Sequence, residues 1–380
     1  MKMTSASNNK PKICFVIPSL NGGGAEKVLI NLANQFGKLV CKPVIISLNK
    51  SLPAYSINKE LKVYHLLDRK SDLILYRLYY IIQTFFKLLF IILKEKPVCV
   101  ISFITSANLW TGVTCNIANT PYIVSERTSP DRSINQLNNF SRNLAALIYK
   151  RAAAVVVSAR GIGGCLKENK AFKKLNNIHL IENAVSQFDR LSLNKVHSRK
   201  FILGVGRLAY VKGFDQLISA YGSAKLDNTD LLIIGEGEER ATLLSQVENL
   251  GLGSRVFMPG TKTNLQDYYN QAELFVLPSR NEGYPNALIE AMSFGCPCVA
   301  MDCDFGPAEI IKHEHNGLLV EAGNITAFAD AIIRLDNNTE LKSKLGNNAK
   351  RIKQTNNAKS ILKKWAQLVL APDQIVTELT

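Results

Sequence analysis

The sequence predicts an α/β protein made of two doubly wound, parallel-sheet domains in tandem, and three observations support this fold class. The chain has 380 residues, which is longer than a single hydrophobic core usually grows. Short apolar runs of strand length alternate with amphipathic stretches of helical periodicity, as in a parallel sheet with helices on both faces. This alternation is interrupted once and then starts again, which indicates a second domain of the same kind.

In the first half of the chain, apolar runs predict strands at 13–17, 44–48, 98–103, 122–124 and 154–157, and a last run at 178–181 ends the pattern. The stretch after the first strand is expected to form a helix that buries one face on the sheet. Its apolar residues recur at helical spacing: Val28, Leu29, Leu32, Ala33 and Phe36.

A polar stretch without an apolar run of strand length separates the two halves, and strands are then predicted at 201–206, 231–234, 256–258, 274–277 and 298–300. We therefore expect a first domain over 1–185, a linker over 186–200 and a second domain over 201–360. The remaining residues, 361–380, are predicted to form a C-terminal helix that can pack back on the first domain, with Trp365 as a large apolar anchor.

Positive charge is concentrated in the first half of the chain. Residues 1–185 contain 25 Lys and Arg against 9 Asp and Glu, a net charge of +16, whereas residues 186–380 contain 21 against 22, a net charge of −1. A field of this sign attracts anionic partners such as nucleic acid, an anionic membrane surface or a phosphate-bearing substrate. The alternative is a set of solvated lysines that only keeps the protein soluble.

The cysteines and the amino terminus are typical of a cytoplasmic protein. The eight cysteines lie mostly in apolar stretches, with no C-x-x-C pair and no spacing typical of zinc ligands, so buried, reduced thiols are expected. The first twelve residues lack the apolar core of a secretory signal.

The stretch 73–93 is long enough to span a membrane. It contains Arg77, Gln83 and Lys87, and a central Arg or Lys costs about 3 kcal/mol on insertion, so a buried or half-buried helix is expected instead. Its aromatic residues spread around most of the helix circumference, which is more than a helix covering a sheet requires: Tyr79, Tyr80, Phe85, Phe86 and Phe90. Either this helix merely packs on the sheet, or the first domain docks through it on an anionic membrane.

Ligands of doubly wound sheets bind beyond the carboxyl ends of the strands, so the turns that follow strands are the candidate sites. The first such turn holds Gly22, Gly23 and Gly24 before a helix, whose N–H groups suit an anionic group. It matches neither a P-loop nor G-x-G-x-x-G, and a tight turn without a ligand is the alternative. The second turn holds Arg207 and Lys212, two cations that suit a diphosphate unless both are solvated surface residues.

The third turn, 277–292, carries the strongest signal. Pro285 is placed like the first residue of a helix and Gly295 like its end, so a helix is predicted directly after a strand. Glu282 and Glu290 are expected to accept hydrogen bonds from sugar hydroxyls. The helix start is expected to offer backbone N–H groups to phosphate oxygens at three positions: Asn286, Ala287 and Leu288.

This third turn resembles glycosyltransferase family four, the retaining enzymes of the GT-B fold, whose signature is two glutamates separated by seven residues. Here those glutamates are Glu282 and Glu290. The surrounding SRNEGYPNALIEAMSFGCPCVA, the later GPAEII and the following NGLLV are also similar, and the resemblance is continuous from about 201 to 335. In the first half it is thinner, and rests on IPSLNGGGAEKV, on SER at 125–127 and on IENAV at 181–185.

The resemblance implies specific roles. In such enzymes the residues matching Arg207 and Lys212 hold the donor diphosphate, the one matching Glu282 faces the transferred sugar, and the one matching Glu290 binds the ribose hydroxyls. The glycine loop with Gly23 and Gly24 lies near the donor phosphate. The resemblance also implies that the first domain binds the acceptor, that the second binds the nucleotide sugar, and that the two face each other across a cleft.

One departure concerns a residue of the first domain. Many relatives place a histidine at the end of the strand that here continues into Glu126 and Arg127, so Glu126 becomes the candidate for that sugar-contacting, catalytic position. None of the five histidines matches it. The letters of a D-x-D metal pair occur at Asp302 and Asp304, but the resemblance gives them no metal role, and neither a metal nor another cofactor is expected.

The predicted function is the retaining, metal-independent transfer of a hexose or N-acetylhexosamine from a UDP-sugar to a lipid-linked glycan acceptor in cell-surface polysaccharide or lipopolysaccharide biosynthesis. The enzyme is expected in the cytoplasm, as a peripheral protein on the cytosolic face of the inner membrane. A sugar-nucleotide epimerase of similar architecture is one alternative. A basic module that binds membrane or nucleic acid is another, although a positive half built of buried parallel strands does not favour nucleic acid.

Overall fold

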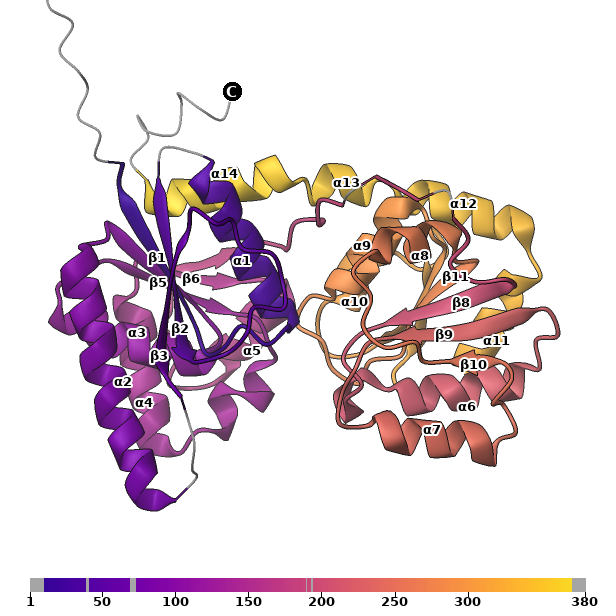
Figure 1. Cartoon of the computed structure of the whole chain (residues 1–380), viewed down its shortest axis with the longest axis horizontal. Helices are drawn as coiled ribbons and strands as arrows, with labels where there is room; N and C mark the ends of the chain where they lie inside the picture. Colours follow the sequence, from indigo (N-terminus) through magenta and orange to yellow (C-terminus); the bar gives the residue numbers. More distant parts are fainter. Residues whose placement is uncertain (1–9, 39–40, 69–72, 189, 193, 371–380) are drawn as a thin grey trace, which may run out of the picture. The chain divides into compact units, whose positions relative to one another are not determined.

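The computed structural model describes residues 10–38, 41–68, 73–188, 190–192 and 194–370. These residues form two compact units, each built around one parallel sheet flanked by helices (Figure 1). The main boundary lies between Ile181 and Glu182, and the end of the chain, from Lys359, belongs to the first unit again. The predicted fold class, two doubly wound α/β domains, is confirmed.

Within the described residues, the first unit contains a seven-stranded sheet of order β3-β2-β1-β4-β5-β6-β7. Strands β1, β4, β5 and β6 are buried almost throughout because helices cover both faces, which explains their uninterrupted apolar sequences. The strands are β1 (Lys12–Ile17), β2 (Lys42–Asn49), β3 (Lys62–Leu67), β4 (Cys99–Phe103), β5 (Tyr122–Glu126), β6 (Ala154–Val157) and β7 (Ile178–Leu180).

The helices of the first unit follow the predicted alternation. Helices α2, α3 and α4 lie side by side on one side of the sheet, and α1 lies on the other (Figure 1). The helical elements are α1 (Gly24–Gly37), α2 (Ile74–Glu95), α3 (Thr105–Ile117), α4 (Asn139–Arg151), α5 (Arg160–Glu168) and α14 (Ala358–Val369), with 3-10 turns η1 (Pro130–Arg132) and η2 (Ile134–Gln136).

The C-terminal helix α14 packs on the first unit through Trp365. This side chain is buried and stacks on Phe103 at the end of β4, with ring centroids 5.8 Å apart. The guanidinium of Arg127 lies over both rings. The helix begins at Ala358, earlier than the predicted 361, and the final part of the predicted helix, 371–380, lies outside the described residues.

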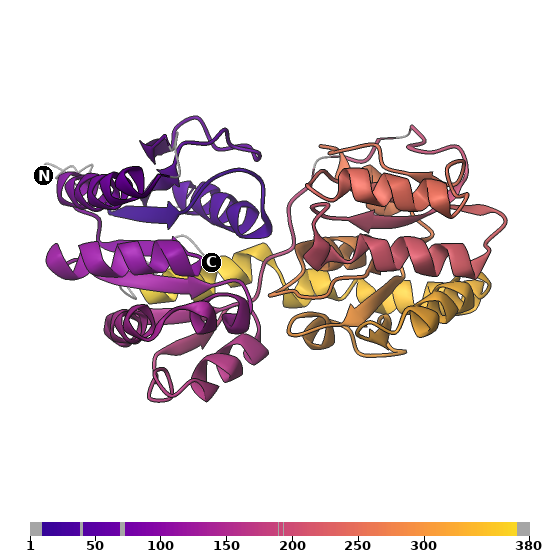
Figure 2. The same cartoon turned by 90° about the horizontal axis from the view of Figure 1, so that it is seen from below.

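The described part of the second unit contains a six-stranded sheet of order β10-β9-β8-β11-β12-β13. Helices α8 and α9 lie on one side of it and α6 and α7 on the other (Figure 1), and the view from below in Figure 2 shows α6 and α7 in front of the strands. The strands are β8 (Lys200–Val205), β9 (Thr229–Ile234), β10 (Val256–Phe257), β11 (Leu274–Leu277), β12 (Cys298–Asp302) and β13 (Leu318–Glu321). The helical elements are η3 (Tyr210–Lys212), α6 (Phe214–Ala224), α7 (Arg240–Asn249), α8 (Leu265–Gln271), α9 (Asn286–Phe294), α10 (Pro307–Ile310), α11 (Ile325–Asp336), α12 (Thr339–Ala349) and α13 (Ile352–Thr355).

Two strands and one connection differ from the sequence prediction. Strands β3 and β13 were not predicted as strands, and both are sheet edges, where exposure on one side permits polar residues within a short run. The predicted linker, 186–200, belongs to the second unit, because side chains of α8 accept hydrogen bonds from its backbone. Ser192 N donates to Asp267 Oδ1 at 2.7 Å, and Val196 N donates to Gln271 Oε1 at 3.1 Å.

Candidate active site

The Arg207 loop, 207–213, connects β8 to α6. Gly213 has a φ of 67°, and a Cβ at this position would lie 2.0 Å from the carbonyl oxygen of Pro278, so only glycine permits this close approach of the loop to the end of β11. Arg207 is exposed, and among the described residues its side chain has no hydrogen-bond or ion-pair partner. Its guanidinium is therefore available to a ligand.

An ion pair joins the Arg207 loop to the loop that follows β11. Lys212 Nζ lies 2.6 Å from Glu282 Oε1, and Ser279 Oγ donates to the same oxygen at 2.7 Å. The side chain of Glu282 is 8% exposed and that of Lys212 is 28% exposed, so the pair borders the solvent through the lysine. The sequence predicted that Lys212 binds the donor diphosphate and that Glu282 faces the transferred sugar. The structure brings these two side chains into direct contact.

Arg280 holds the two loops together, and the sequence analysis did not single it out. Its guanidinium donates to both carboxylate oxygens of Asp215, at 2.7 and 2.6 Å, and to the carbonyl oxygen of Tyr210 at 2.8 Å. It also lies 4.1 Å from the centroid of the Tyr210 ring. Burial alone would raise the pKa of Asp215, but the hydrogen bonds from Arg280 hold it below its usual value. The bidentate pair links the loop after β11 to α6, and the bond to Tyr210 holds the Arg207 loop in place.

Helix α9 begins where the sequence predicted a phosphate-binding helix start. Pro285 occupies the cap position, one residue before the predicted first helical position, and Gly295 ends the helix with a φ of 77°. The first N–H groups of a helix have no carbonyl partner within it, so the backbone N–H groups of Asn286, Ala287 and Leu288 are not used inside α9.

Glu290 lies on the buried face of α9 and is 2% exposed. Its Oε1 accepts a hydrogen bond from Ser186 Oγ at 2.6 Å, and its Oε2 accepts one from Tyr269 OH at 3.1 Å. The carboxylate thus accepts hydrogen bonds from two hydroxyl groups of the protein itself, whereas the sequence analysis predicted hydroxyl groups of the donor sugar. Its burial was not expected, and neither Tyr269 nor Ser186, which lies in the predicted linker, was recognised as a neighbour.

The glycine turn of the first unit forms as predicted, with Gly23 as the cap residue and Gly24 as the first residue of α1. Gly22 has a φ of 103°, and a Cβ there would lie 2.9 Å from that of Ala54, so a side chain is excluded. A Cβ at Gly23 would meet the carboxylate of Glu26 at 2.3 Å. An acidic side chain therefore lies over this helix start, which weakens its attraction for anions.

Glu126 does not have the environment expected of a sugar-contacting residue. It is 0% exposed, and its carboxylate accepts hydrogen bonds from Thr105 Oγ1, Asn108 Nδ2 and Tyr149 OH. Burial raises its pKa to about 7, although these hydrogen bonds oppose the shift. The structure thus corrects the sequence hypothesis, because α3 and α4 cover the end of β5 and enclose this carboxylate.

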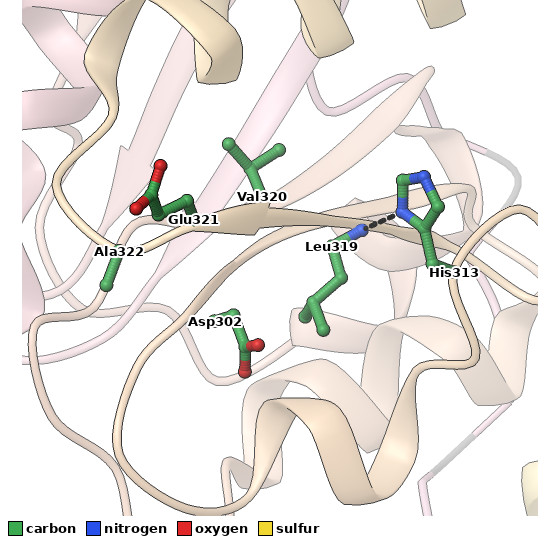
Figure 3. A pocket seen from close by; sticks show the side chains of 6 residues that line it. All are labelled: Asp302, His313, Leu319, Val320, Glu321 and Ala322. Carbon is green, nitrogen blue, oxygen red and sulfur yellow. Dashed lines mark hydrogen bonds between the residues drawn. The ribbon is translucent and has the colours of Figure 1, made fainter.

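The D-x-D letters, Asp302 and Asp304, lie at the end of β12. Groups of three or more Asp, Glu, His or Cys side chains with the arrangement of metal ligands are absent from the described part of the chain. Asp302 instead lines an open pocket of about 530 Å³ together with Glu321 and His313 (Figure 3). His313 Nδ1 accepts a hydrogen bond from Leu319 N, so this histidine caps the edge strand β13.

Comparisons with known proteins show which families and structures this chain resembles. Residues 185–352 match the family described as Glycosyl transferases group 1. An uncharacterized glycosyltransferase of Haemophilus influenzae is 29% identical, over 93% of this chain and 98% of its own. An α-1,4-N-acetyl-D-galactosaminyltransferase of Campylobacter jejuni, named for a GalNAc-GalNAc-diNAcBac-PP-undecaprenol, is 26% identical over 94% of this chain and 98% of its own. The structure of Anabaena HepE in complex with UDP-glucose is similar with a TM-score of 0.78 at 19% identity, over 94% of this chain and 98% of that one.

Two doubly wound parallel sheets, with cationic and acidic loops at the carboxyl ends of the second, define an α/β protein of the GT-B type. Residues 185–352 match the group 1 family of glycosyl transferases, and the two relatives named above, which are similar over 93–94% of this chain, are glycosyltransferases.

Proposed function

We propose that this protein transfers a hexose or N-acetylhexosamine from a UDP-sugar, with retention at the anomeric carbon, to a lipid-linked glycan acceptor of bacterial cell-surface polysaccharide biosynthesis. The contact between the Arg207 loop and the Glu282 loop is the main support for the proposed donor site. It combines an exposed guanidinium, an ammonium and a carboxylate at the carboxyl edge of the sheet, next to the start of α9. The HepE structure with UDP-glucose and the undecaprenol-linked compound in the name of the C. jejuni relative support the choice of donor and acceptor.

The ion pair between Lys212 and Glu282 can bind the diphosphate and the sugar of such a donor at the same time. A lysine ammonium has three N–H donors, and one of them is used on Glu282. The others can bind diphosphate oxygens while Glu282 accepts from a sugar hydroxyl, so that one contact positions the phosphate relative to the sugar. With Arg207 and the N–H groups of α9, Lys212 would stabilise the charge that grows on the diphosphate as it leaves.

In the proposed step, the bond between the anomeric carbon and the donor phosphate oxygen breaks, and a bond to the acceptor hydroxyl oxygen forms on the same face. The hydroxyl proton passes to the departing phosphate oxygen. The positive charge needed on the diphosphate comes from Arg207, Lys212 and the helix start. We therefore expect transfer to continue in EDTA at the rate seen with Mg²⁺.

Binding of UDP tests the donor site. Glu290→Gln keeps the size of a buried side chain but removes the charge that strengthens hydrogen bonds from the ribose hydroxyls, so UDP affinity should fall about tenfold or more. Titration calorimetry of the wild type and the variant measures this. Glu290→Ala is a poorer test, because it leaves Tyr269 and Ser186 without a buried acceptor and should also cost about 1–3 kcal/mol of stability. Equal UDP affinity in wild type and Glu290→Gln would contradict the ribose role.

We also propose that the first unit docks on an anionic membrane through the α2 stripe, a row of apolar side chains on the solvent side of α2. The opposite face of the helix is packed, with Tyr80, Leu88 and Ile92 buried. The segment Tyr76–Glu95 is long and apolar enough to span a membrane, but this packing supports a position along the surface. The α2 stripe consists of Tyr79, Ile82, Phe86, Phe90 and Leu93, each between 46% and 64% exposed.

The charge around the α2 stripe suits an anionic bilayer. Arg77, Lys87 and Lys94 lie on the same helix and are exposed, and Lys94 Nζ lies 5.8 Å from the centroid of the Phe90 ring. Each cation near such a surface contributes about 1 kcal/mol. Together with the net charge of +16 over residues 1–185, this favours a peripheral position on the cytosolic face of the inner membrane.

Co-sedimentation with phosphatidylglycerol vesicles tests docking by the α2 stripe. The double variant Phe86→Ser/Phe90→Ser should bind about tenfold or more weakly, since each ring loses more than 1 kcal/mol of apolar burial. The matched control is Leu244→Ser/Leu250→Ser, two exposed leucines of the second unit. High salt should also weaken binding of the wild type to these vesicles. Equal binding of the wild type and both double variants would contradict the proposal.

A further inference from the structure

A second charged cavity lies in the first unit, at the edge of the sheet opposite to the strand-end loops. This amino-edge pocket has a volume of about 540 Å³ and is formed where β1, β2 and β3 begin and α2 ends. Its charged lining residues are four lysines and two glutamates: Lys10, Lys12, Lys42, Lys62, Glu60 and Glu95. The glycosyl transfer described above uses none of them.

The lysines start from neighbouring strands. Lys12 of β1 lies opposite Lys42 of β2 in the sheet register, and Lys62 begins β3 opposite Val44 of β2. Adjacent strands are about 4.8 Å apart, so these three side chains leave the sheet within about two strand spacings of one another. They form a row of cations along one edge of the cavity.

Glu95 orders two of these lysines. Its buried carboxylate lies 2.8 Å from Lys12 Nζ and 2.6 Å from Lys62 Nζ, and it accepts a hydrogen bond from Tyr64 OH at 2.5 Å. Burial alone would raise the pKa of Glu95, but these hydrogen bonds lower it to about 2, so the carboxylate is ionised at neutral pH. Both ammonium groups are thus bound to one carboxylate. They still reach solvent, because the side chain of Lys12 is 36% exposed and that of Lys62 is 51% exposed.

The charges in the amino-edge pocket do not balance. Four lysines against two glutamates leave a net charge of +2, of which the cluster around Glu95 accounts for +1. Lys42 is exposed and takes no part in that cluster. Like charges gathered around a cavity raise the local concentration of anions and are stabilised when an anion of matching charge enters. Ammonium groups whose positions are already fixed also lose little conformational entropy when they bind such an anion.

We propose that the amino-edge pocket binds a phosphate-bearing anion, with Lys42 as a direct ligand and the ammonium groups of Lys12 and Lys62 as a pre-ordered pair. Its volume suits a phosphorylated small molecule or a phospholipid headgroup. Both sources share the same chemistry, an anionic phosphate group. This site is separate from the donor site and does not depend on the proposed transfer.

The test is calorimetric titration of the full chain with inorganic pyrophosphate. Because pyrophosphate also fits the proposed donor site, the titration is repeated with Arg207→Ala, which removes binding there and leaves the amino-edge pocket intact. In that background Lys42→Gln should weaken the remaining binding about tenfold or more, since it removes one charge-assisted contact. Lys150→Gln, an exposed lysine on α4 outside the pocket, is the matched control and should have no effect.

Vesicles distinguish the two sources of the anion. If the natural ligand is a lipid headgroup, Lys42→Gln should bind phosphatidic acid vesicles more weakly than Lys150→Gln does, even where free pyrophosphate binds poorly. Loss of pyrophosphate binding with unchanged vesicle binding identifies a soluble ligand. If Lys42→Gln equals Lys150→Gln in both measurements, the site does not exist, whatever Arg207→Ala does to transfer.

Discussion

Replacing Arg207 with alanine is expected to lower kcat/KM for sugar transfer by about 30- to 1000-fold, or about 2 to 4 kcal/mol. The guanidinium is exposed, and within the described chain it has no protein partner, so its position is explained by the diphosphate that we propose it binds. For the same reason the melting temperature should not change. Steady-state kinetics with a UDP-sugar, together with thermal unfolding, separate the two effects.

The matched control is Arg334→Ala. Arg334 is a half-exposed arginine of the second unit that pairs with Glu314 on the surface, and such pairs contribute little to stability. Its transfer activity should equal that of the wild type. If Arg207→Ala also kept full activity, the diphosphate would bind elsewhere and the role of the Arg207 loop would be wrong.

A pH-dependent change in stability is expected from Glu126. Its pKa is about 7 in the folded protein against an ordinary value of 4.5, so the folded state binds the proton more tightly than the unfolded state. The resulting stabilisation is fully present below pH 4.5 and is lost as the pH rises through 7. A shift of this size corresponds to about 3 kcal/mol.

Glu126→Gln removes this titration while keeping the side chain's shape. The difference in unfolding free energy between wild type and variant should therefore change by about 3 kcal/mol from pH 4.5 to pH 8, with the wild type relatively more stable at the acid end. Urea unfolding across this range measures the difference. A difference that stays constant with pH would show that Glu126 has the same pKa in the folded and unfolded states, which would contradict this prediction.

The two sheets could be predicted because buried parallel strands leave an unmistakable sequence pattern. β6 and β11 were predicted with their observed ends, since each is a short apolar run covered on both faces. β3 was missed because its edge position permits polar side chains such as Lys62 and His65 within the short strand, which interrupts the apolar run. The 186–200 segment was taken for a linker because hydrogen bonds to α8 leave no apolar pattern.

For the candidate site, the sequence predicted the loops on which the candidate residues lie but not the contacts of their side chains. Strand-end position and helix-start residues placed Arg207, Lys212 and Glu282 correctly on adjoining loops of the second sheet. Burial could not be predicted, because it depends on residues far apart in the chain. Glu290 accepts hydrogen bonds from Ser186 and Tyr269, and Arg280 donates to Asp215, which lies sixty-five positions earlier in the chain.

The central claim is that the second unit activates a nucleotide sugar for transfer to an acceptor. The most direct measurement is product analysis with a sugar-labelled UDP-sugar and a bacterial lipid extract as the source of acceptor, for wild type and Glu282→Gln. We predict that the label moves into the lipid-linked fraction as UDP is released, in EDTA as in Mg²⁺, and that Glu282→Gln abolishes this movement. Label that stays in an epimerised nucleotide sugar, or appears only as free sugar, would contradict the account.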